Sequence, residues 1–403
     1  MELKKYKIGD LAHVTRGASL GGEFYATQGN YVRLTCGNFD YRNNCFKENQ
    51  SKENIYYTGG FKEEFLLEKG DIITPLTEQA IGLLGSTARI PESGKYIQSQ
   101  DIAKIDCNES LLDKDFAFYL ISSACVKQQL SAAAQQTKIR HTSPDKIKEC
   151  TVWIPSLDVQ KRIGRILTDI DNKIAINRQI NDNLEAMARQ LYDYWFVQFD
   201  FPNEEGKPYK SSGGAMVWND KLKRKIPQGW STLPISAILD KYPTTKRYET
   251  KEYLSQGNYP IIDQGDTYIV GYTNEDDNLL TRHPAVLFGD HSTKVKFLDF
   301  DFARGADGTQ ILYSSNDAVS QYYLYLAVST LQIPNPGYSR HFKYLKELPI
   351  VIPSLSTAIK FANIVKPLFK KWTNNIFNNI ALTKQRDELL PLLMNGQASV
   401  NSD

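Results

Sequence analysis

The residues of this sequence best suited to bind an anionic ligand are lysine, arginine and histidine side chains in stretches expected to be loops. Such groups can neutralise phosphates, and an arginine can donate two hydrogen bonds to guanine. Taken singly, each is more often a solvated surface charge. Both halves of the chain, however, place an Arg-His pair shortly before a long helical segment. The candidate nucleic-acid-contacting residues are Lys138, Arg140, His141, Lys246, Arg247, Lys294, Arg304, Arg340 and His341.

Three other motifs resemble catalytic sites, and a structural reading fits each of them better. Residues 335–338 (NPGY) lack the second proline of an amino-methyltransferase loop, and no glycine-rich cofactor-binding turn precedes them. Asp145 and residues 171–173 have the spacing of a metal-dependent nuclease, but Lys173 is expected on a helix seam, where carboxylates cannot converge on Mg²⁺. Residues 289–292 (GDHS) are adjacent, whereas a catalytic triad needs separate segments. No GxxxxGK[ST] loop occurs, so ATP use by this chain is not expected.

Loops need a scaffold, and the clearest scaffold element is a long helix expected within residues 154–196. Ser156 suits the N-cap position, because its hydroxyl can accept a first-turn amide hydrogen. Apolar residues recur at both seam positions of a heptad, which predicts a coiled-coil helix about 60 Å long. One seam comprises Ile163, Ile170, Asn177, Leu184 and Leu191, and the other Ile166, Ile180, Met187 and Tyr194.

The same helical stretch occurs a second time, 198 residues later. Residues 352–394 align with residues 154–196 without a gap, and ten of these 43 positions are identical, including the IPSL start. Asn177 and Asn375 share a seam position, and a buried polar seam residue fixes helix register. The alternative is two unrelated amphipathic helices, each packed on its own domain. In the second helix, the residues at the first seam position are Phe361, Leu368, Asn375, Leu382 and Leu389.

Two prolines distinguish the second helix from the first. An interior proline removes one backbone hydrogen bond and usually kinks a helix. We therefore expect the second helix to be less straight, with a regular start only near Pro367, and to stop at residues 395–396 (NG) after Pro391.

The two long helices divide the chain into a tandem duplication of one unit. Residues 257–262 resemble residues 29–34, and both globular regions mix short strands, turns and helices. The predicted order is a first domain (1–153), a first long helix (154–198), a connector (199–229), a second domain (230–351), a second long helix (352–396) and a tail (397–403).

Composition is typical of a globular protein of two or three domains. The chain has 403 residues, of which 41% are hydrophobic and 23% charged. No signal peptide and no apolar run of membrane-spanning length is visible, so a cytoplasmic location is expected. The five cysteines form no CxxC pairs, which argues against zinc or disulfides and favours a reducing compartment. A net charge of +2 neither supports nor excludes nucleic acid.

Taken together, these features resemble the specificity subunit of type I restriction–modification systems over nearly the whole chain. The residues that carry the resemblance are the paired IPSL-plus-helix regions, residues 211–218 (SSGGAMVW), residues 226–230 (IPQGW) and residues 389–397 (LLPLLMNGQ). The acidic-Gln helix start of the family appears as residues 158–160 (DVQ) but is absent from residues 356–358. This difference weakens the expected symmetry of partner contacts.

The resemblance implies an α+β fold, with two similar target-recognition domains separated by two long antiparallel coiled-coil helices. Each domain would read one half of a split, asymmetric double-stranded DNA target, and this chain would catalyse nothing itself. Two modification subunits would dock on the helices and methylate adenine with S-adenosylmethionine. Restriction subunits would add ATP- and Mg²⁺-dependent cleavage. No cofactor, metal or membrane is implied for this chain.

The resemblance also makes the helix pair a ruler between two DNA readers. A helix of about 60 Å bounds the separation of the half-sites at about 18 base pairs. If a pseudo-two-fold axis relates the copies, Asn177 and Asn375 should lie near each other at the middle of the pair. Two other functions stay open. A coiled-coil scaffold would bind DNA weakly and without salt dependence, and a self-contained nuclease or methyltransferase would need a convergent acid cluster or a cofactor loop.

Overall fold

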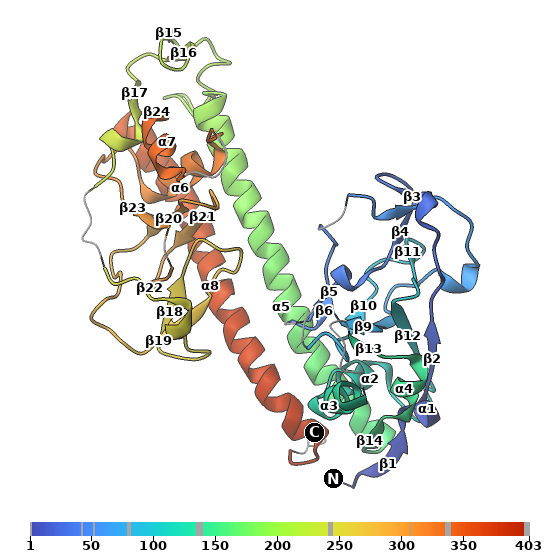
Figure 1. Cartoon of the computed structure of the whole chain (residues 1–403). Coiled ribbons are helices and arrows are strands. Elements are labelled where there is room, and N and C mark those ends of the chain that lie inside the picture. The colour runs from blue at the N-terminus through green and yellow to red at the C-terminus, as the bar shows by residue number, and fades with distance from the viewer. Residues whose placement is uncertain are drawn as a thin grey trace. The chain divides into compact units, whose positions relative to one another are not determined.

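The computed structural model describes residues 2–41, 43–50, 53–78, 82–133, 140–240, 245–306, 308–334 and 340–398. Its contacts divide the chain into two compact units. Unit 1 comprises residues 1–175 and 379–403, and unit 2 comprises residues 176–378. Each unit combines one globular domain with part of each long helix (Figure 1). The fold is α+β, as the sequence predicts.

Unit 1 is built on two four-stranded sheets and short helices. One sheet has the order β10–β8–β12–β2 and the other β11–β4–β7–β3. Their strands are β2 (Ala12–Arg16), β3 (Tyr25–Ala26), β4 (Tyr31–Arg33), β7 (Tyr56–Tyr57), β8 (Ile72–Pro75), β10 (Ala88–Arg89), β11 (Tyr96–Ile97) and β12 (Ile102–Cys107). Two-stranded pairs join β1 (Lys4–Lys7) to β14 (Thr151–Ile154), β5 (Phe39–Asp40) to β6 (Cys45–Phe46), and β9 (Thr77–Glu78) to β13 (Arg140–His141). The helices are α1 (Ile8–Leu11), α2 (Lys114–Ile121), α3 (Ala124–Ala133) and α4 (Pro144–Glu149).

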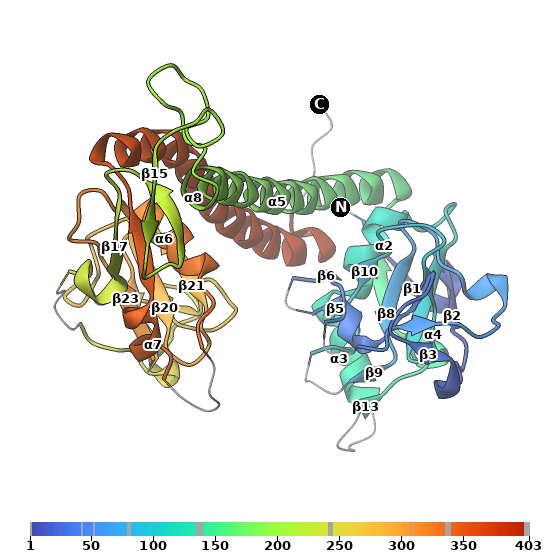
Figure 2. The same cartoon turned by 90° about the horizontal axis from the view of Figure 1, so that it is seen from above.

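Unit 2 repeats much of this plan with smaller sheets. Its three-stranded sheets have the orders β19–β18–β22 and β21–β20–β23. Their strands are β18 (Tyr259–Ile262), β19 (Gly271–Thr273), β20 (Ala285–Gly289), β21 (Val295–Leu298), β22 (Ala303–Arg304) and β23 (Thr309–Leu312). Two-stranded pairs join β17 (Ser231–Pro234) to β24 (Pro349–Ile352) and β15 (Met216–Asn219) to β16 (Arg224–Pro227). Helix α6 (Gln321–Thr330) lies against β20 and β21 (Figure 2), and α7 (Phe342–Glu347) precedes β24.

The strand that opens each domain pairs with the strand that leads into its long helix. Lys4 of β1 pairs with Ile154, and Ser231 of β17 pairs with Ile352. Both pairs are antiparallel, and Ile154 and Ile352 are 198 residues apart. Each unit therefore closes its domain at the same point of the duplicated sequence.

The two long helices are α5 (Leu157–Tyr192) and α8 (Leu355–Met394). Each begins directly after the serine of an IPSL motif, and Ser354 Oγ accepts a hydrogen bond from Thr357 N at 3.2 Å, as an N-cap residue does. α5 ends in a wider π-type turn, Asp193–Val197, that buries Trp195 and Phe196. Both aromatic rings contact Phe361 in the core of unit 2.

The expected late start of the second helix near Pro367 is wrong. α8 is helical from Leu355 through Pro367 without interruption. Pro367 is exposed, whereas Val365 and Phe369 on the opposite face are buried in the core of unit 2. Burial of these apolar side chains offsets the roughly 3 kcal/mol cost of an interior proline.

The helices pack antiparallel within each unit. In unit 1, Ile163 and Leu167 of α5 share a core with Leu393 and Met394 of α8. In unit 2, the end of α5 packs against the first half of α8, as Trp195 contacts Phe361. The ten residues predicted at the first seam position, five in α5 and five in α8, are all buried or half-buried.

The second seam position of α5, which comprises Ile166, Ile180, Met187 and Tyr194, follows the prediction only in part. Ile166 and Ile180 are half-buried, but Met187 and Tyr194 are 55% and 37% exposed. Lys173, expected on the seam, is also exposed. A strict heptad has 3.5 residues per turn, whereas a straight helix has 3.6, so one face drifts out of the contact as the helix lengthens.

Asparagines near the middle of the helices cross-link them within each unit. In unit 2, Asn181 Nδ2 donates to the carbonyl of Trp372 at 3.0 Å. In unit 1, Asn379 Nδ2 donates to the carbonyl of Ile174 at 3.3 Å. The two bonds are equivalent in the duplication, because Asn379 and Trp372 lie 198 residues after Asn181 and Ile174. Asn375 Nδ2 donates to Asn181 Oδ1 at 2.8 Å, so its hydrogen-bonded partner lies one helical turn beyond Asn177.

Among the described residues, no helix combines the length and the apolar content needed to cross a membrane.

Candidate nucleic-acid interface

Loops from five parts of unit 2 meet where β18, β20 and β22 end, and we call them the unit 2 loop cluster. It comprises residues 245–247, 263–266, 289–294, 304–306, 308 and 340–341. Asp290 N donates to the carbonyl of Gly308 at 2.7 Å, and His341 N donates to the carbonyl of Asp290 at 2.8 Å. Arg304 Nη2 donates to the carbonyl of Thr245 at 2.7 Å. The cluster is thus a connected surface built from segments far apart in sequence.

The turn at 289–294 is held by hydrogen bonds on all sides. Gly289 N donates to the carbonyl of Lys294 at 2.8 Å, which closes the turn. Gln264 Oε1 accepts from His291 N at 2.9 Å and from Ser292 N at 3.3 Å. Ser292 Oγ in turn donates to the carbonyl of Gln264 at 2.7 Å. The adjacent acid, imidazole and hydroxyl therefore form a rigid turn, as the sequence indicates, and not a relay.

Two glycines allow these loops to approach one another closely. A Cβ on Gly308 would lie 2.5 Å from Gln264 Nε2 and 2.7 Å from His291 Cδ2. A Cβ on Gly305 would lie 2.6 Å from Tyr253 Oη. Real Cβ contacts are never this short, and Gly308 also has a φ of +84°, which disfavours other residues.

Arg304 is buried, although the sequence places it among surface cations. Its side chain is 7% exposed, and its Nε has no hydrogen-bond partner among the described residues. Arg247 lies beside it through a parallel β-bridge. Burial, and secondarily the charge of Arg247, lowers the pKa of Arg304 below its ordinary value. The buried Arg304 thus holds the 245–247 segment in place through its hydrogen bond to Thr245.

Lys246 is already neutralised within the cluster. Its Nζ lies 3.0 Å from a carboxylate oxygen of Glu275 and 3.2 Å from one of Glu252. The ammonium also lies 4.2 Å from the centre of the Tyr248 ring. The hydrogen bond with Glu275 is the main cause of the raised pKa of Lys246.

The other cations of the cluster differ in exposure. Lys294 is exposed and pairs with Asp266. Arg340 is exposed, whereas His341 is 5% exposed and its Nδ1 lies 3.0 Å from the carbonyl oxygen of Asp290. Asp290 itself is buried and accepts from Phe342 N at 2.8 Å, so it fastens the start of α7. Six of the nine candidate contact residues fall in this one cluster.

Unit 1 has loops at the corresponding place. Thr142 N donates to the carbonyl of Leu76 at 2.8 Å, next to the β9–β13 pair. Arg140 Nη1 donates to Ser131 Oγ at 3.1 Å, and His141 is exposed. Lys138 lies outside the described residues, as do residues 335–338.

The two Arg-His pairs are not structurally equivalent. α4 and α7 begin 198 residues apart, at Pro144 and Phe342. His341 directly precedes α7, but His141 lies in β13 and Ser143 caps α4. The resemblance between the pairs is therefore local, because the extra residues of the first domain fall between the pair and the helix.

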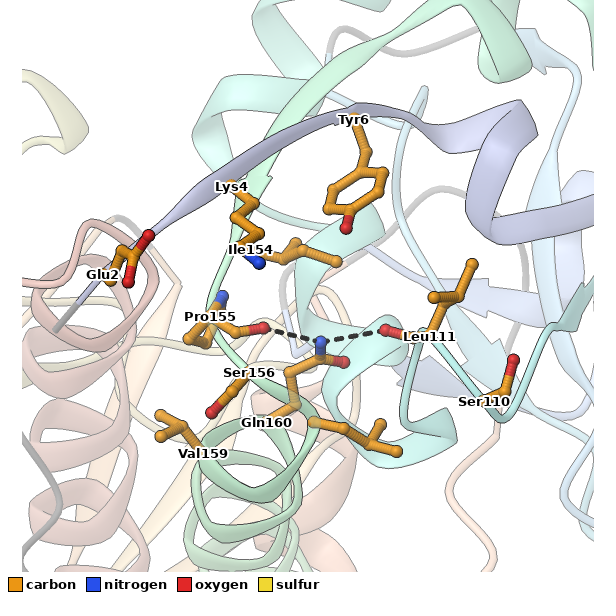
Figure 3. Close-up of a pocket in the computed structure, with 11 residues that line it drawn as sticks. Glu2, Lys4, Tyr6, Ser110, Leu111, Ile154, Pro155, Ser156, Val159 and Gln160 are labelled. Atoms are coloured by element: carbon orange, nitrogen blue, oxygen red, sulfur yellow. Dashed lines mark hydrogen bonds between the residues drawn. The ribbon is translucent and has the colours of Figure 1, made fainter.

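A cavity of about 380 Å³ lies in unit 1 beside the start of α5 (Figure 3). Gln160 is one of the residues that line this cavity, and it is only 1% exposed. Its amide donates to the carbonyls of Leu111 at 3.0 Å and Pro155 at 2.9 Å, and its Oε1 accepts from Asp113 N at 3.0 Å. Gln160 thus ties α2 to α5 internally. Its absence at Ala358 changes an internal bond of unit 2 and need not change a partner surface.

Each domain is also anchored to the helices by a tyrosine and a carboxylate. In unit 1, Tyr119 Oη donates to Asp171 at 2.7 Å, and Arg386 Nη1 donates to the same carboxylate at 2.8 Å. In unit 2, Tyr325 Oη donates to Glu185 at 2.8 Å. Asp171, a residue of the nuclease-like spacing, is thereby occupied in a structural role.

The described residues contain no group of three or more His, Cys, Asp or Glu side chains placed to hold a metal ion. Sequence reasoning did not select Gln264, Asp290 and His291 as site residues. The hydrogen bonds that join Gln264 to His291 and Asp290 to Phe342 link residues 27 and 52 positions apart, so the only local signal in the sequence is the glycines around them.

Comparisons with known proteins agree on one family. The family model described as the type I restriction modification DNA specificity domain matches residues 1–186 and 227–382. The MjaIX specificity subunit of Methanocaldococcus jannaschii is 24% identical over 88% of this chain and 86% of its own length. The HindI specificity subunit of Haemophilus influenzae is 27% identical over 49% of this chain and 41% of its own length. A crystal structure of the type I S subunit from M. genitalium has the same fold, with a TM-score of 0.61 at 17% identity over 98% of this chain and 96% of that one. Because the family model covers most of the chain in two segments, this protein belongs to the family of type I restriction–modification DNA specificity proteins.

Proposed function

We propose that this chain is the non-catalytic DNA specificity subunit of a type I restriction–modification complex. Its two domains read the two halves of a split, asymmetric target on double-stranded DNA. The observation that carries this function is the duplication itself. The two units close their domains at equivalent residues but place different side chains at the corresponding loops.

The unit 2 loop cluster supports DNA contact by its charge and its rigidity. Arg340 and Lys294, the latter paired with Asp266, are exposed cations that can approach phosphates. Arg140 and His141 in unit 1, with Lys138 beside them in sequence, supply the corresponding candidates. Lys246, Arg247, Arg304 and His341 shape the cluster of unit 2, and their contribution to affinity includes holding its loops.

The long helices provide the binding surface for two modification subunits, which carry S-adenosylmethionine and methylate adenine in the target. Several apolar side chains on them are exposed, and exposed apolar surface is typical of protein–protein contacts. Met187 is 55% exposed, Ile359 51% and Ile364 47%. Restriction subunits would add ATP- and Mg²⁺-dependent translocation and cleavage.

Mapping methylated adenines in cells with and without this chain tests the function. We expect a bipartite motif that disappears when the chain is deleted and the modification subunit is kept. Identical methylation patterns in both cell lines would contradict the proposal. A matched control with a catalytically inactive modification subunit should remove the motif while leaving this chain in place.

A further inference from the structure

One exposed imidazole in the unit 2 loop cluster has features expected of a base-reading group. His291 is exposed at the tip of the 289–294 turn. Its imidazole makes no hydrogen bond within the part of the chain that the structure describes. The ring lies beside Gly308, where a side chain of any size would collide with it. Because Gly308 has no Cβ atom, a ligand can approach the imidazole across this residue.

The backbone of the turn is not available to bind a phosphate. The amides of His291 and Ser292 donate to Gln264, and those of Thr293 and Gly289 donate within the turn. Lys294 N donates to Ser292 Oγ at 3.3 Å. All six backbone amides of residues 289–294 are thus already hydrogen-bonded, which argues against an anion-binding nest.

Rigidity separates base reading from phosphate binding. A phosphate contact tolerates a mobile lysine, because it only has to neutralise charge. A base contact needs a donor or acceptor held within a fraction of an ångström. Gln264 restrains the backbone that carries the imidazole, because its Oε1 accepts from two successive amides of the turn and its carbonyl accepts from Ser292 Oγ.

We propose that His291 reads a base edge in the half-site bound by the second domain, and that Gln264 is a positioning residue that holds His291 in place. This inference rests on the proposed function and names a specificity-determining residue within it. The ligand is the edge of a base pair in double-stranded DNA, and the imidazole would donate to or accept from it. Neither residue takes part in a reaction.

The test uses the full chain assembled with the modification subunits of its own system, in cells and in vitro. Methylated adenines are mapped for the wild type, for His291→Ala and for Gln264→Ala. The affinity for the wild-type motif is then compared with that for single-base variants of each half-site. For His291→Ala we expect discrimination at one position of one half-site to fall about 10-fold or more, with the other half-site and the spacer unchanged.

His283, which lies just before β20, provides a matched control. It precedes β20, whereas His291 follows β20, so the two histidines mark opposite ends of one strand. Its Nδ1 lies 3.2 Å from a carboxylate oxygen of Asp299. His283→Ala should leave discrimination unchanged at every position.

A double-mutant cycle distinguishes positioning from mere stabilisation. If Gln264 acts through His291, Gln264→Ala should not reduce discrimination further in a His291→Ala background. Hydrogen exchange of residues 289–294 should rise in Gln264→Ala and stay unchanged in His291→Ala.

The outcomes are separable. Uniformly weaker binding to all sequences, with discrimination unchanged, would overturn base reading in favour of a phosphate contact. An unaltered motif for His291→Ala would also overturn it. Absence of any motif for the wild-type chain would instead refute the proposed function, and the assignment of His291 with it.

Discussion

Neutralising Asp171 is expected to loosen the attachment of the first domain to the helices. This carboxylate accepts hydrogen bonds from Tyr119 at 2.7 Å and from Arg386 at 2.8 Å. The side chains of Arg386 and Asp171 are 9% and 28% exposed. In Asp171→Asn the shape is kept, but the guanidinium loses a charged partner while it stays buried.

The magnitude follows from what each partner retains. A hydrogen bond to a charged group contributes about 1.5–3 kcal/mol, and removing one partner of a buried pair costs about 3–5 kcal/mol. Arg386 keeps Asp387 at 2.8 Å, but the Asp387 side chain is 58% exposed and therefore screened. We expect a loss of about 2–3 kcal/mol in the free energy of unfolding of unit 1, or a melting temperature lower by about 5–10 °C.

The assay is thermal unfolding combined with hydrogen exchange resolved by segment. Exchange should rise in α2 and in the last turns of α8, both in unit 1, and stay unchanged in residues 355–369 of unit 2. Glu388→Gln is the matched control, because the Lys384–Glu388 pair on the same helix is 3.9 Å apart with side chains 62% and 65% exposed. This control should change stability by less than about 0.5 kcal/mol.

A second substitution, at Arg386, should reverse part of this loss. Replacing Arg386 with Met in the Asp171→Asn background removes a buried charge whose one remaining partner, Asp387, is largely exposed, and should restore part of the lost stability. Equal effects of Asp171→Asn and Glu388→Gln would refute the claim that burial makes this ion pair important. So would an Arg386→Met double variant that is less stable than Asp171→Asn alone.

Three further outcomes are expected. Asn375 is fully buried, its Oδ1 lacks a partner among the described residues, and its Nδ2 donates to Asn181. Asn375→Leu alone should destabilise unit 2, because it leaves Asn181 Oδ1 without this donor. The variant with Leu at both positions should be about 1–2 kcal/mol more stable than that single variant in urea unfolding. Burial lowers the pKa of Lys296 from 10.5 to about 8, so the folded state binds fewer protons than the unfolded state between these pH values. The free energy of unfolding should therefore rise with pH across this window. Lys296→Met should remove that rise when unfolding is measured from pH 7.5 to 10.5. DNA affinity of the assembled complex should fall steeply between 50 and 200 mM salt in a titration, and a flat salt response would favour a scaffold without DNA contact.

The sequence alone determines the long helices and the duplication. Heptad spacing and a capping serine act within a few residues, so the helix start at Leu157 follows directly from the first IPSL motif. The start of the second helix at Leu355 was wrongly expected near Pro367. The family resemblance predicted from these motifs is confirmed by the family model, again because the signal is carried by contiguous residues.

Only the tertiary structure decided which residues meet. Pro367 stays helical because Val365 and Phe369 are buried opposite it, and Arg304 is buried because a segment nearly sixty residues earlier lies beside its strand. His291 becomes a candidate reader through Gln264, and no local pattern encodes that bond. Loops converge through the pairing of strands distant in sequence, so side-chain exposure and partnership at this surface depend on the whole fold.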